Sequence, residues 1–152
     1  MLISDQYFME LALRKAKKAK EKGEVPVGAV IVKNGIVVSA SNNSVEKDLS
    51  SLMHAEIKAI YRAQKELENW RLTGCVLYVT LEPCLMCCGA ILLSRIKKLV
   101  YAAADPKGGA AASLYRTLED ARLNHRVEVV SGVMETEAAA LLADFFKEKR
   151  LN

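Results

Sequence analysis

The sequence contains few of the residues that mark unusual classes of protein. Its 152 residues include only three prolines and eight glycines, which excludes a collagen-like or low-complexity chain. Lys or Arg interrupts each apolar run, as in Ile91–Val100, so none is long enough to cross a membrane. The first residues, Met1–Gln6, lack the basic start and apolar stretch of a signal peptide. The sequence therefore predicts a cytoplasmic protein that does not enter a membrane.

The chain does contain enough apolar residues for a packed core. Hydrophobic residues make up 51% of the sequence and charged residues 26%, with a formal net charge of +4. This composition is too apolar for a disordered chain, and the length suits one domain. Because no repeat or linker divides the sequence, we expect a single domain over residues 1–152.

Apolar periodicity and turn residues predict an alternation of strands and helices. Asn34-Gly35 between two runs rich in Val and Ile indicates a hairpin. Helices are expected at Asp5–Lys22, His54–Leu67, after Pro83, at Ser113–Ala121 and at Glu135–Lys149. Strands are expected at Gly28–Val32, Ile36–Ser41, Val76–Leu81, Leu99–Ala104 and Arg126–Ser131, with loops at Asn42–Ser51 and Asp105–Ala112. The pattern favours the α/β class, with helices on both faces of a five-stranded mixed sheet that opens with an antiparallel hairpin.

The cysteines point to metal or redox chemistry. In a reducing cytoplasm the four cysteines are expected to stay free, and three of them lie within Cys84–Cys88. Cys84 and Cys87 are three residues apart, which places both on one face of a helix. Pro83 suits the first helical position, so both sulfurs would lie at a helix N-terminus, where the helix dipole favours thiolate.

A histidine and a glutamate complete this constellation. His54 and two thiolates supply three ligands and leave a fourth tetrahedral position open, as in catalytic zinc sites. Glu56 follows His54 by two residues, so the pair must straddle a helix start, with His54 in the irregular first turn. Glu56 is then expected beside the water in the open position, where it can take a proton and pass it to a leaving group. The sequence thus predicts one catalytic Zn²⁺ per chain, held by His54, Cys84 and Cys87.

These residues and their neighbours also have plainer interpretations. A Cys-x-x-Cys pair can be a redox pair or half of a structural zinc site. The first leaves the histidine and glutamate without a role, and the second lacks a fourth ligand. We expect Cys75 and Cys88 to be buried small side chains and His125 to order a loop. Lys107-Gly108-Gly109 lacks the Gly-Lys-Ser/Thr of a P-loop and is expected to be a turn.

Three further features allow RNA contact without requiring it. Basic residues crowd the first helix and the end of the chain: Lys15, Lys17, Lys18, Lys20 and Lys22, then Lys147, Lys149 and Arg150. Such clusters can hold phosphates, but interspersed glutamates also suit a solvated helix face. Asn43, in the polar loop before His54, could read a base through its amide. Phe145-Phe146 is more typical of core packing than of a stacking platform.

The whole pattern resembles the zinc-dependent cytidine-deaminase-like superfamily, and within it the deaminases that act on adenosine in tRNA. His54-Ala55-Glu56 with Pro83-Cys84-Leu85-Met86-Cys87 matches the signature of zinc deaminases. The resemblance extends from Tyr7 to Arg150. The run Thr80–Cys87, together with Asn124-His125-Arg126-Val127 and the phenylalanine pair, favours the tRNA-acting branch.

The resemblance implies a homodimer of three-layer α/β/α subunits that converts adenosine to inosine at the wobble position of tRNA, chiefly arginine tRNA with an ACG anticodon. It implies that Glu56 shuttles the proton, that Asn43 contacts the flipped base and that the Ala55 N–H supports the reacting edge. Asp105 and the loop after it would meet flanking nucleotides of the anticodon stem-loop, and Phe145 would wall the pocket. The basic C-terminal residues would meet RNA phosphates.

One segment departs from the pattern, and other functions stay open. Relatives often carry Asp-Pro-Thr-Ala before His-Ala-Glu, whereas Ser50-Ser51-Leu52-Met53 stands here, which affects the pocket wall rather than the metal ligands. The same zinc chemistry would serve a deaminase of a free base, nucleoside or nucleotide, such as guanine, cytosine or deoxycytidylate. A catalytically silent RNA-binding subunit would lack Glu56, and a structural zinc module would unfold without its metal.

Overall fold

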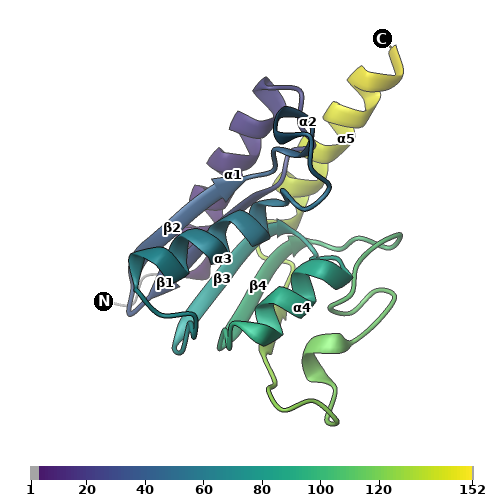
Figure 1. The fold of residues 1–152 in the computed structure, drawn as a ribbon. Helices are drawn as coiled ribbons and strands as arrows, with labels where there is room; N and C mark the ends of the chain where they lie inside the picture. The colour runs from purple at the N-terminus through teal and green to yellow at the C-terminus, as the bar shows by residue number, and fades with distance from the viewer. Residues whose placement is uncertain (1–3, 152) are drawn as a thin grey trace.

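A computed structural model describes residues 4–151 of the chain. Met1–Ile3, part of the segment in which no signal peptide is expected, and Asn152 lie outside the described residues. The elements in chain order are α1 (Asp5–Glu21), β1 (Gly28–Lys33), β2 (Ile36–Asn42), α2 (Val45–Asp48), α3 (Ala55–Glu66), β3 (Cys75–Leu81), α4 (Leu85–Leu93), β4 (Lys98–Ala103), the 3₁₀ helix η1 (Thr117–Glu119), β5 (Glu128–Ser131) and α5 (Glu135–Leu151) (Figure 1). Within residues 4–151, no helix combines the length and apolar character of a membrane span.

The five strands form one mixed sheet in the order β2-β1-β3-β4-β5, which confirms the predicted class of fold. β1 pairs antiparallel with β2 and β3, while β3, β4 and β5 run parallel. The hairpin turns at Asn34-Gly35, where both residues have positive φ, 51° and 76°. Two central residues with positive φ are typical of a type I′ turn, whose twist matches that of the flanking strands.

Helices cover both faces of the sheet, so that it lies between two separate cores (Figure 1). Successive residues of a strand point to opposite faces. Ala29 and Ile31 of β1 therefore pack towards α3 and α4, and Val30 and Val32 pack towards α1. Helix α1 approaches β1 so closely that a Cβ on Gly28 would lie 2.0 Å from the Ala12 carbonyl oxygen.

Two of the predicted loop and helix boundaries near the site are wrong. The segment Asn42–Ser51 is not a loop throughout, because it contains α2, whose Glu46 and Lys47 N–H groups donate to the Glu24 carboxylate. Pro83 is not the first residue of α4. Cys84 lies between Pro83 and the helix and is its N-cap, in an extended conformation. The Cys84 carbonyl accepts the first helical hydrogen bond, from the Cys88 N–H.

The helix predicted at Ser113–Ala121 is also wrong, since only η1 forms there. The Thr117 N–H donates to the Ala110 carbonyl, and the Leu118 carbonyl accepts from the Val127 N–H, so both groups are used outside an α-helical pattern. The remaining helices and strands match their predicted ranges to within one or two residues at each end.

Candidate active site and metal centre

Three side chains that can bind a metal meet where α3 and α4 begin. His54 is the N-cap of α3, Cys84 is the N-cap of α4, and Cys87 lies in the first turn of α4. One donor atom of each residue lies within 4.8 Å of the others, and these three residues form a group that could hold a metal ion. The His54 Nδ1 atom is 3.6 Å from the Cys84 Sγ and 3.5 Å from the Cys87 Sγ. The helix starts thus bring together the three residues that the sequence singles out.

The two helix N-termini and the hydrogen bonds within the group favour a thiolate at Cys84. Hydrogen bonds from Cys87 and His54 lower the pKa of the Cys84 thiol to about 3. The hydrogen bond to Cys84 also raises the pKa of His54. The same bond to Cys84, together with burial, raises the pKa of Cys87, because its proton is shared with the neighbouring sulfur. Cys84 is therefore favoured as a thiolate, the form of cysteine that binds a metal cation.

Glu56 lies next to this group but does not belong to the set of metal donors. It is the second residue of α3, it is 4% exposed, and it lines the same cavity as His54 and Cys84. Burial raises the pKa of its carboxyl group, because a charge is costly in an apolar surrounding. A buried carboxyl group beside a metal site is placed to accept and return a proton.

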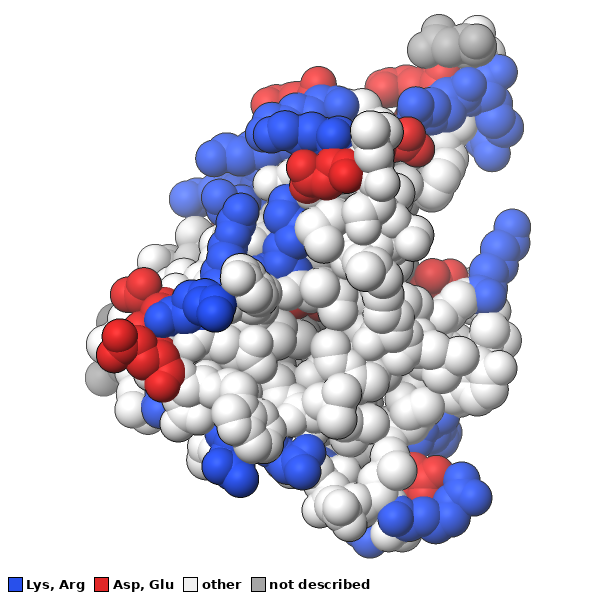
Figure 2. Space-filling model, viewed as in Figure 1, with Lys and Arg blue, Asp and Glu red and all other residues white. Residues whose placement is uncertain are grey.

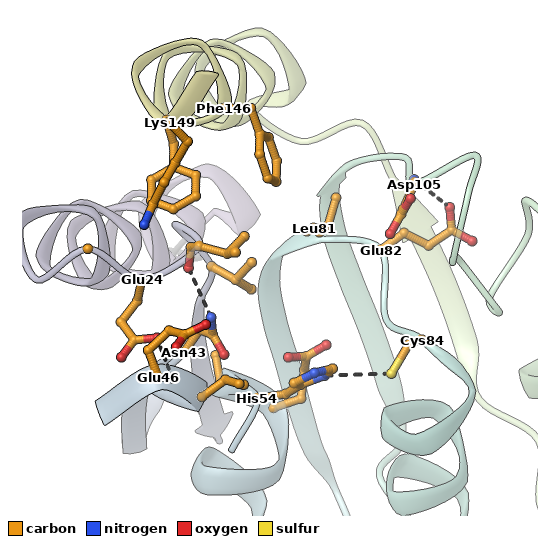
Figure 3. A pocket seen from close by; sticks show the side chains of 17 residues that line it. Glu24, Asn43, Glu46, His54, Leu81, Glu82, Cys84, Asp105, Phe146 and Lys149 are labelled. Atoms are coloured by element: carbon orange, nitrogen blue, oxygen red, sulfur yellow. Dashed lines mark hydrogen bonds between the residues drawn. The ribbon is translucent and has the colours of Figure 1, made fainter. Parts of the chain in front are cut away.

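His54, Glu56 and Cys84 line a cavity of about 440 Å³ that opens between α3, α5 and the β3–α4 connection (Figure 3). Its wall is mostly apolar, with Val25, Val27 and Leu81 on the sheet side. Phe146 and Lys149 of α5 lie across the cavity from His54. The cavity therefore combines an apolar wall with a few polar groups, as sites for small ligands or single bases do.

Asn43 presents an unused hydrogen-bond acceptor in this cavity. Its side chain is 6% exposed, and its Nδ2 donates to the Val25 carbonyl at 3.3 Å. Its Oδ1 is buried and has no hydrogen-bond partner within the described part of the chain. A buried, unpaired amide oxygen is costly, so a ligand that donates a hydrogen bond there would satisfy it.

The other predicted contact residues also reach the cavity. Ala55 lies at the start of α3, where its N–H has no partner inside the helix. Asp105 lines the cavity and accepts hydrogen bonds from the Lys107 and Gly108 N–H groups, which confirms a turn at Lys107-Gly108-Gly109. Phe145 is 6% exposed and lines the cavity, with the Lys149 ammonium 5.6 Å from the centre of its ring.

Several other residues from the sequence analysis lie away from the cavity. None of Ser50–Met53 lines it, since Val45 and Glu46 form the wall on that side. His125 contacts the Ile96 carbonyl at 2.7 Å and so ties down its loop, as expected. Cys75 and Cys88 are fully buried free cysteines, which confirms that they are packing residues, and burial raises the pKa of Cys88 to about 12.

Sequence reasoning missed the role of Glu82, which holds the loop that carries Asp105. The Glu82 carboxylate accepts hydrogen bonds from the N–H groups of Asp105, Ala111, Ala112 and Ser113, and from the Ser113 hydroxyl. Burial opposes the charge of this carboxylate, but the hydrogen bonds outweigh it and lower its pKa. The only local signal is an acidic residue directly before Pro83-Cys84, since its partners lie at least 23 residues away.

A mixed five-stranded sheet with a His-Cys-Cys group at two helix starts defines the cytidine-deaminase-like class of proteins. Comparison with known proteins agrees. The model of the MafB19-like deaminase family matches residues 3–150. A tRNA-specific adenosine deaminase of Bacillus subtilis is 50% identical over 98% of this chain and 92% of its own, and one of Aquifex aeolicus is 50% identical over 97% of each.

A solved structure from studies of A-to-I editing by tRNA:A34 deaminases has the same fold. It superposes with a TM-score of 0.86 at 46% identity, covering 90% of this chain and 99% of the other. The chain therefore belongs to the MafB19-like deaminase family, together with these tRNA-specific adenosine deaminases.

Proposed function

We propose that the protein is a zinc-dependent hydrolase that converts adenosine to inosine at the wobble position of tRNA, chiefly arginine tRNA with an ACG anticodon. The observation that carries the proposal is one cavity lined by His54, Cys84 and the buried carboxyl of Glu56, where Cys87 completes the three-donor metal group. Its relatives over nearly the full length are tRNA-specific adenosine deaminases, which indicates the substrate.

The donor group fits zinc. Tetrahedral zinc with bonds of about 2.3 Å to sulfur and about 2.1 Å to nitrogen separates sulfur and nitrogen ligands by about 3.6 Å. The His54 Nδ1 lies 3.6 and 3.5 Å from the two sulfurs. Two thiolates and a neutral imidazole would balance the charge of one Zn²⁺ and leave a position for water. Zinc bound there would supply Lewis acidity and lower the pKa of that water to ~7.

The residues of the chain then divide the remaining work. Glu56 takes a proton from the attacking water and returns it to the departing amine, so that hydroxyl replaces the amino group at C6 and ammonia leaves. Asn43 offers its free Oδ1 to a donor on the base, and the Ala55 N–H, at the positive end of α3, supports the reacting edge. Phe145 and Leu81 exclude bulk water from the pocket.

The substrate enters as a single base that has left its stack. Extruding a base is cheaper in a hairpin loop than in a duplex, which suits an anticodon stem-loop. Asp105 lies where nucleotides beside the target would pass, and Lys149 stands on the α5 side of the cavity to meet phosphate. Lys147 and Arg150 lie on the same helix but do not line the cavity, so they are assigned to phosphates outside it.

Incubation with two kinds of substrate tests the assignment. The zinc-loaded protein is given an arginine anticodon hairpin with ACG, the matched hairpin with guanosine at the wobble position, and free nucleosides. Inosine is expected only in the first, detected by sequencing as adenosine read as guanosine. Ammonia released only from free nucleosides would instead assign the protein to the free-nucleoside deaminases.

The active unit is proposed to be a homodimer. Helix α4 contains no charged residue, and its Leu85 and Leu93 are 51% and 72% exposed in the single chain. Covering apolar side chains that gather on a helix with a partner subunit is favourable, because their surface is removed from water.

A cytoplasmic location fits both the tRNA substrate and four cysteines that are all free.

The dimer is tested by mass. We expect light scattering to give twice the 16.7 kDa of one chain, and Leu93→Asp to shift the protein to the single-chain mass. Leu151→Asp places the same charge at an exposed leucine of α5 and should leave the mass unchanged. A wild-type protein that runs as one chain at all concentrations contradicts the homodimer.

A further inference from the structure

Positive side chains gather on one side of the cavity, around the exposed edge of the sheet. Strand β2 is one of the two edge strands, with α1 and α3 beside it. Figure 2 shows Lys and Arg side chains crowded over this part of the molecule. The members, which we call the β2-edge patch, are Lys15 and Lys18 of α1, Lys22 at its C-cap, Lys47 of α2, and Lys58 and Arg62 of α3.

Three of these lysines, from α1 and its C-cap, form a stripe. Lys15, Lys18 and Lys22 are spaced by three and four residues, which places them on one face of the helix. From Lys15 to Lys22 this stripe extends about 10 Å along the helix axis. Ala12, Ala16 and Ala19 of the same helix are fully buried, so the stripe flanks the packed face.

The patch is continuous from α1 to α3. Burial lowers the pKa of Lys15, and the charges of Lys18, Arg62 and Lys22 add to the shift. Burial and the charge of Arg62 lower the pKa of Lys58 in the same way, with Lys47 and Lys22 adding to the shift and Asp48 opposing it. Lys22 thus acts on patch members of both helices. None of the salt bridges found within residues 4–151 includes a member of the patch.

Edge protection explains only part of this charge. Lys58 donates to the Asn42 carbonyl at 2.9 Å, and Arg62 donates to the Ala40 carbonyl at 3.0 Å, so both cover the open edge of β2. Charged side chains on an edge strand prevent pairing with another chain. The α1 stripe and Lys47 make no such bonds to the strand in the described structure, so they need another explanation.

Two members of the patch are sequence neighbours of residues that line the cavity. Lys22 precedes Gly23 and Glu24, and Lys47 follows Glu46; these three neighbours all line the cavity. A polymer that inserts one unit into the cavity and leaves on this side therefore crosses the patch. Lys149 stands on the α5 side of the same cavity.

We propose that the β2-edge patch binds the phosphodiester backbone of the RNA whose base occupies the cavity, outside the loop that carries this base. The inference rests on the proposed RNA substrate and extends it to a second surface. A repeating anion matches a row of unpaired cations, and each neutralised phosphate releases a counterion. Contacts of this kind position the RNA and carry no base specificity.

Salt-dependent binding by two matched double variants tests this surface. Lys18→Gln/Lys22→Gln removes two charges from the patch. Arg14→Gln/Lys17→Gln removes two from another side of α1, in a groove that also holds Glu10, Glu137 and Asp144. The probe is a fluorescent full-length tRNA with guanosine at the wobble position, which has no amino group at C6 and is not turned over. Anisotropy is measured with the zinc-loaded protein over a series of KCl concentrations.

The patch variant is expected to bind about tenfold more weakly than wild type at 0.1 M KCl. Its slope of log affinity against log salt should be shallower by about 1.5, while the control variant keeps both values. An equal loss of tRNA affinity in the two variants, or no loss in either, would overturn the proposal that the patch binds RNA. Inosine formation is assayed separately. If the protein binds tRNA through the patch but makes no inosine, the proposed reaction is contradicted, and the assignment of the patch as an RNA-binding surface is still supported.

Discussion

Replacing Glu56 with alanine is expected to lower inosine formation by about 10³-fold or more while zinc and tRNA stay bound. Glu56 is the acid that the cavity places beside the metal group, and it is not one of the three metal donors. Its removal therefore takes away the proton transfer and leaves the ligands in place. The measurements are single-turnover inosine formation, zinc content per chain and tRNA binding by anisotropy.

A matched control separates this loss from a general effect of charge in the cavity. Glu46 also lines the cavity but is exposed, so Glu46→Gln should retain activity within a fewfold. Stability provides a second check. Removing a buried carboxyl group with a raised pKa should not lower the melting temperature much, because the desolvation cost disappears with it. Normal turnover by Glu56→Ala would remove this residue from the mechanism.

The core of the site could be predicted because its signals are local. Pro83-Cys84-x-x-Cys87 and His54-x-Glu56 each lie at a helix start, and the short spacing within each motif keeps its side chains near that start. The strands of the sheet could be predicted for a similar reason. Asn34-Gly35 and the runs of β-branched residues determine a turn and its flanking strands within a few positions of the sequence.

The errors arose where one distant carboxylate decides the local structure. Glu24 accepts the N–H groups of Glu46 and Lys47 across more than 20 residues of chain, and thereby stabilises a helix in a segment without helical periodicity. Glu82 gathers the N–H groups of Ala112 and Ser113 in the same way, but no α-helix follows them, because the Thr117 N–H donates to the Ala110 carbonyl rather than to that of Ser113. Neither pairing has a sequence signature, because each acidic residue would look the same on a solvated surface.

The predicted start of α4 was wrong for a different reason. The preference of proline for the first helical position is statistical, and a helix can equally begin two residues later. Here Cys84 takes the extended N-cap conformation, with ψ of 178°. This places its sulfur outside the helix and opposite His54, whereas a helical Cys84 would carry it on the helix surface. The metal group therefore depends on a backbone detail that spacing alone does not specify.

The second large effect is expected at that position. Cys84→Ser should lose zinc and with it all measurable inosine formation, because a serine hydroxyl does not ionise at neutral pH as the Cys84 thiol does. Changes to residues that only support a ligand cost about 10–100-fold in metal affinity, so loss of a ligand should cost more. Zinc is measured by atomic emission on protein that has been dialysed against a weak chelator.

Cys88→Ala is the matched control, since Cys88 lies on the same helix, is fully buried and is not a member of the donor group. It should keep one zinc per chain and lose only some stability, because a small cavity replaces the sulfur. Wild type and Cys88→Ala should both melt at higher temperature when zinc is added to metal-free protein, and Cys84→Ser should not, because only a ligand that binds the folded state raises its stability. Full zinc occupancy in Cys84→Ser would contradict the ligand assignment, and the open coordination position on which the reaction depends would then have to be built from other residues.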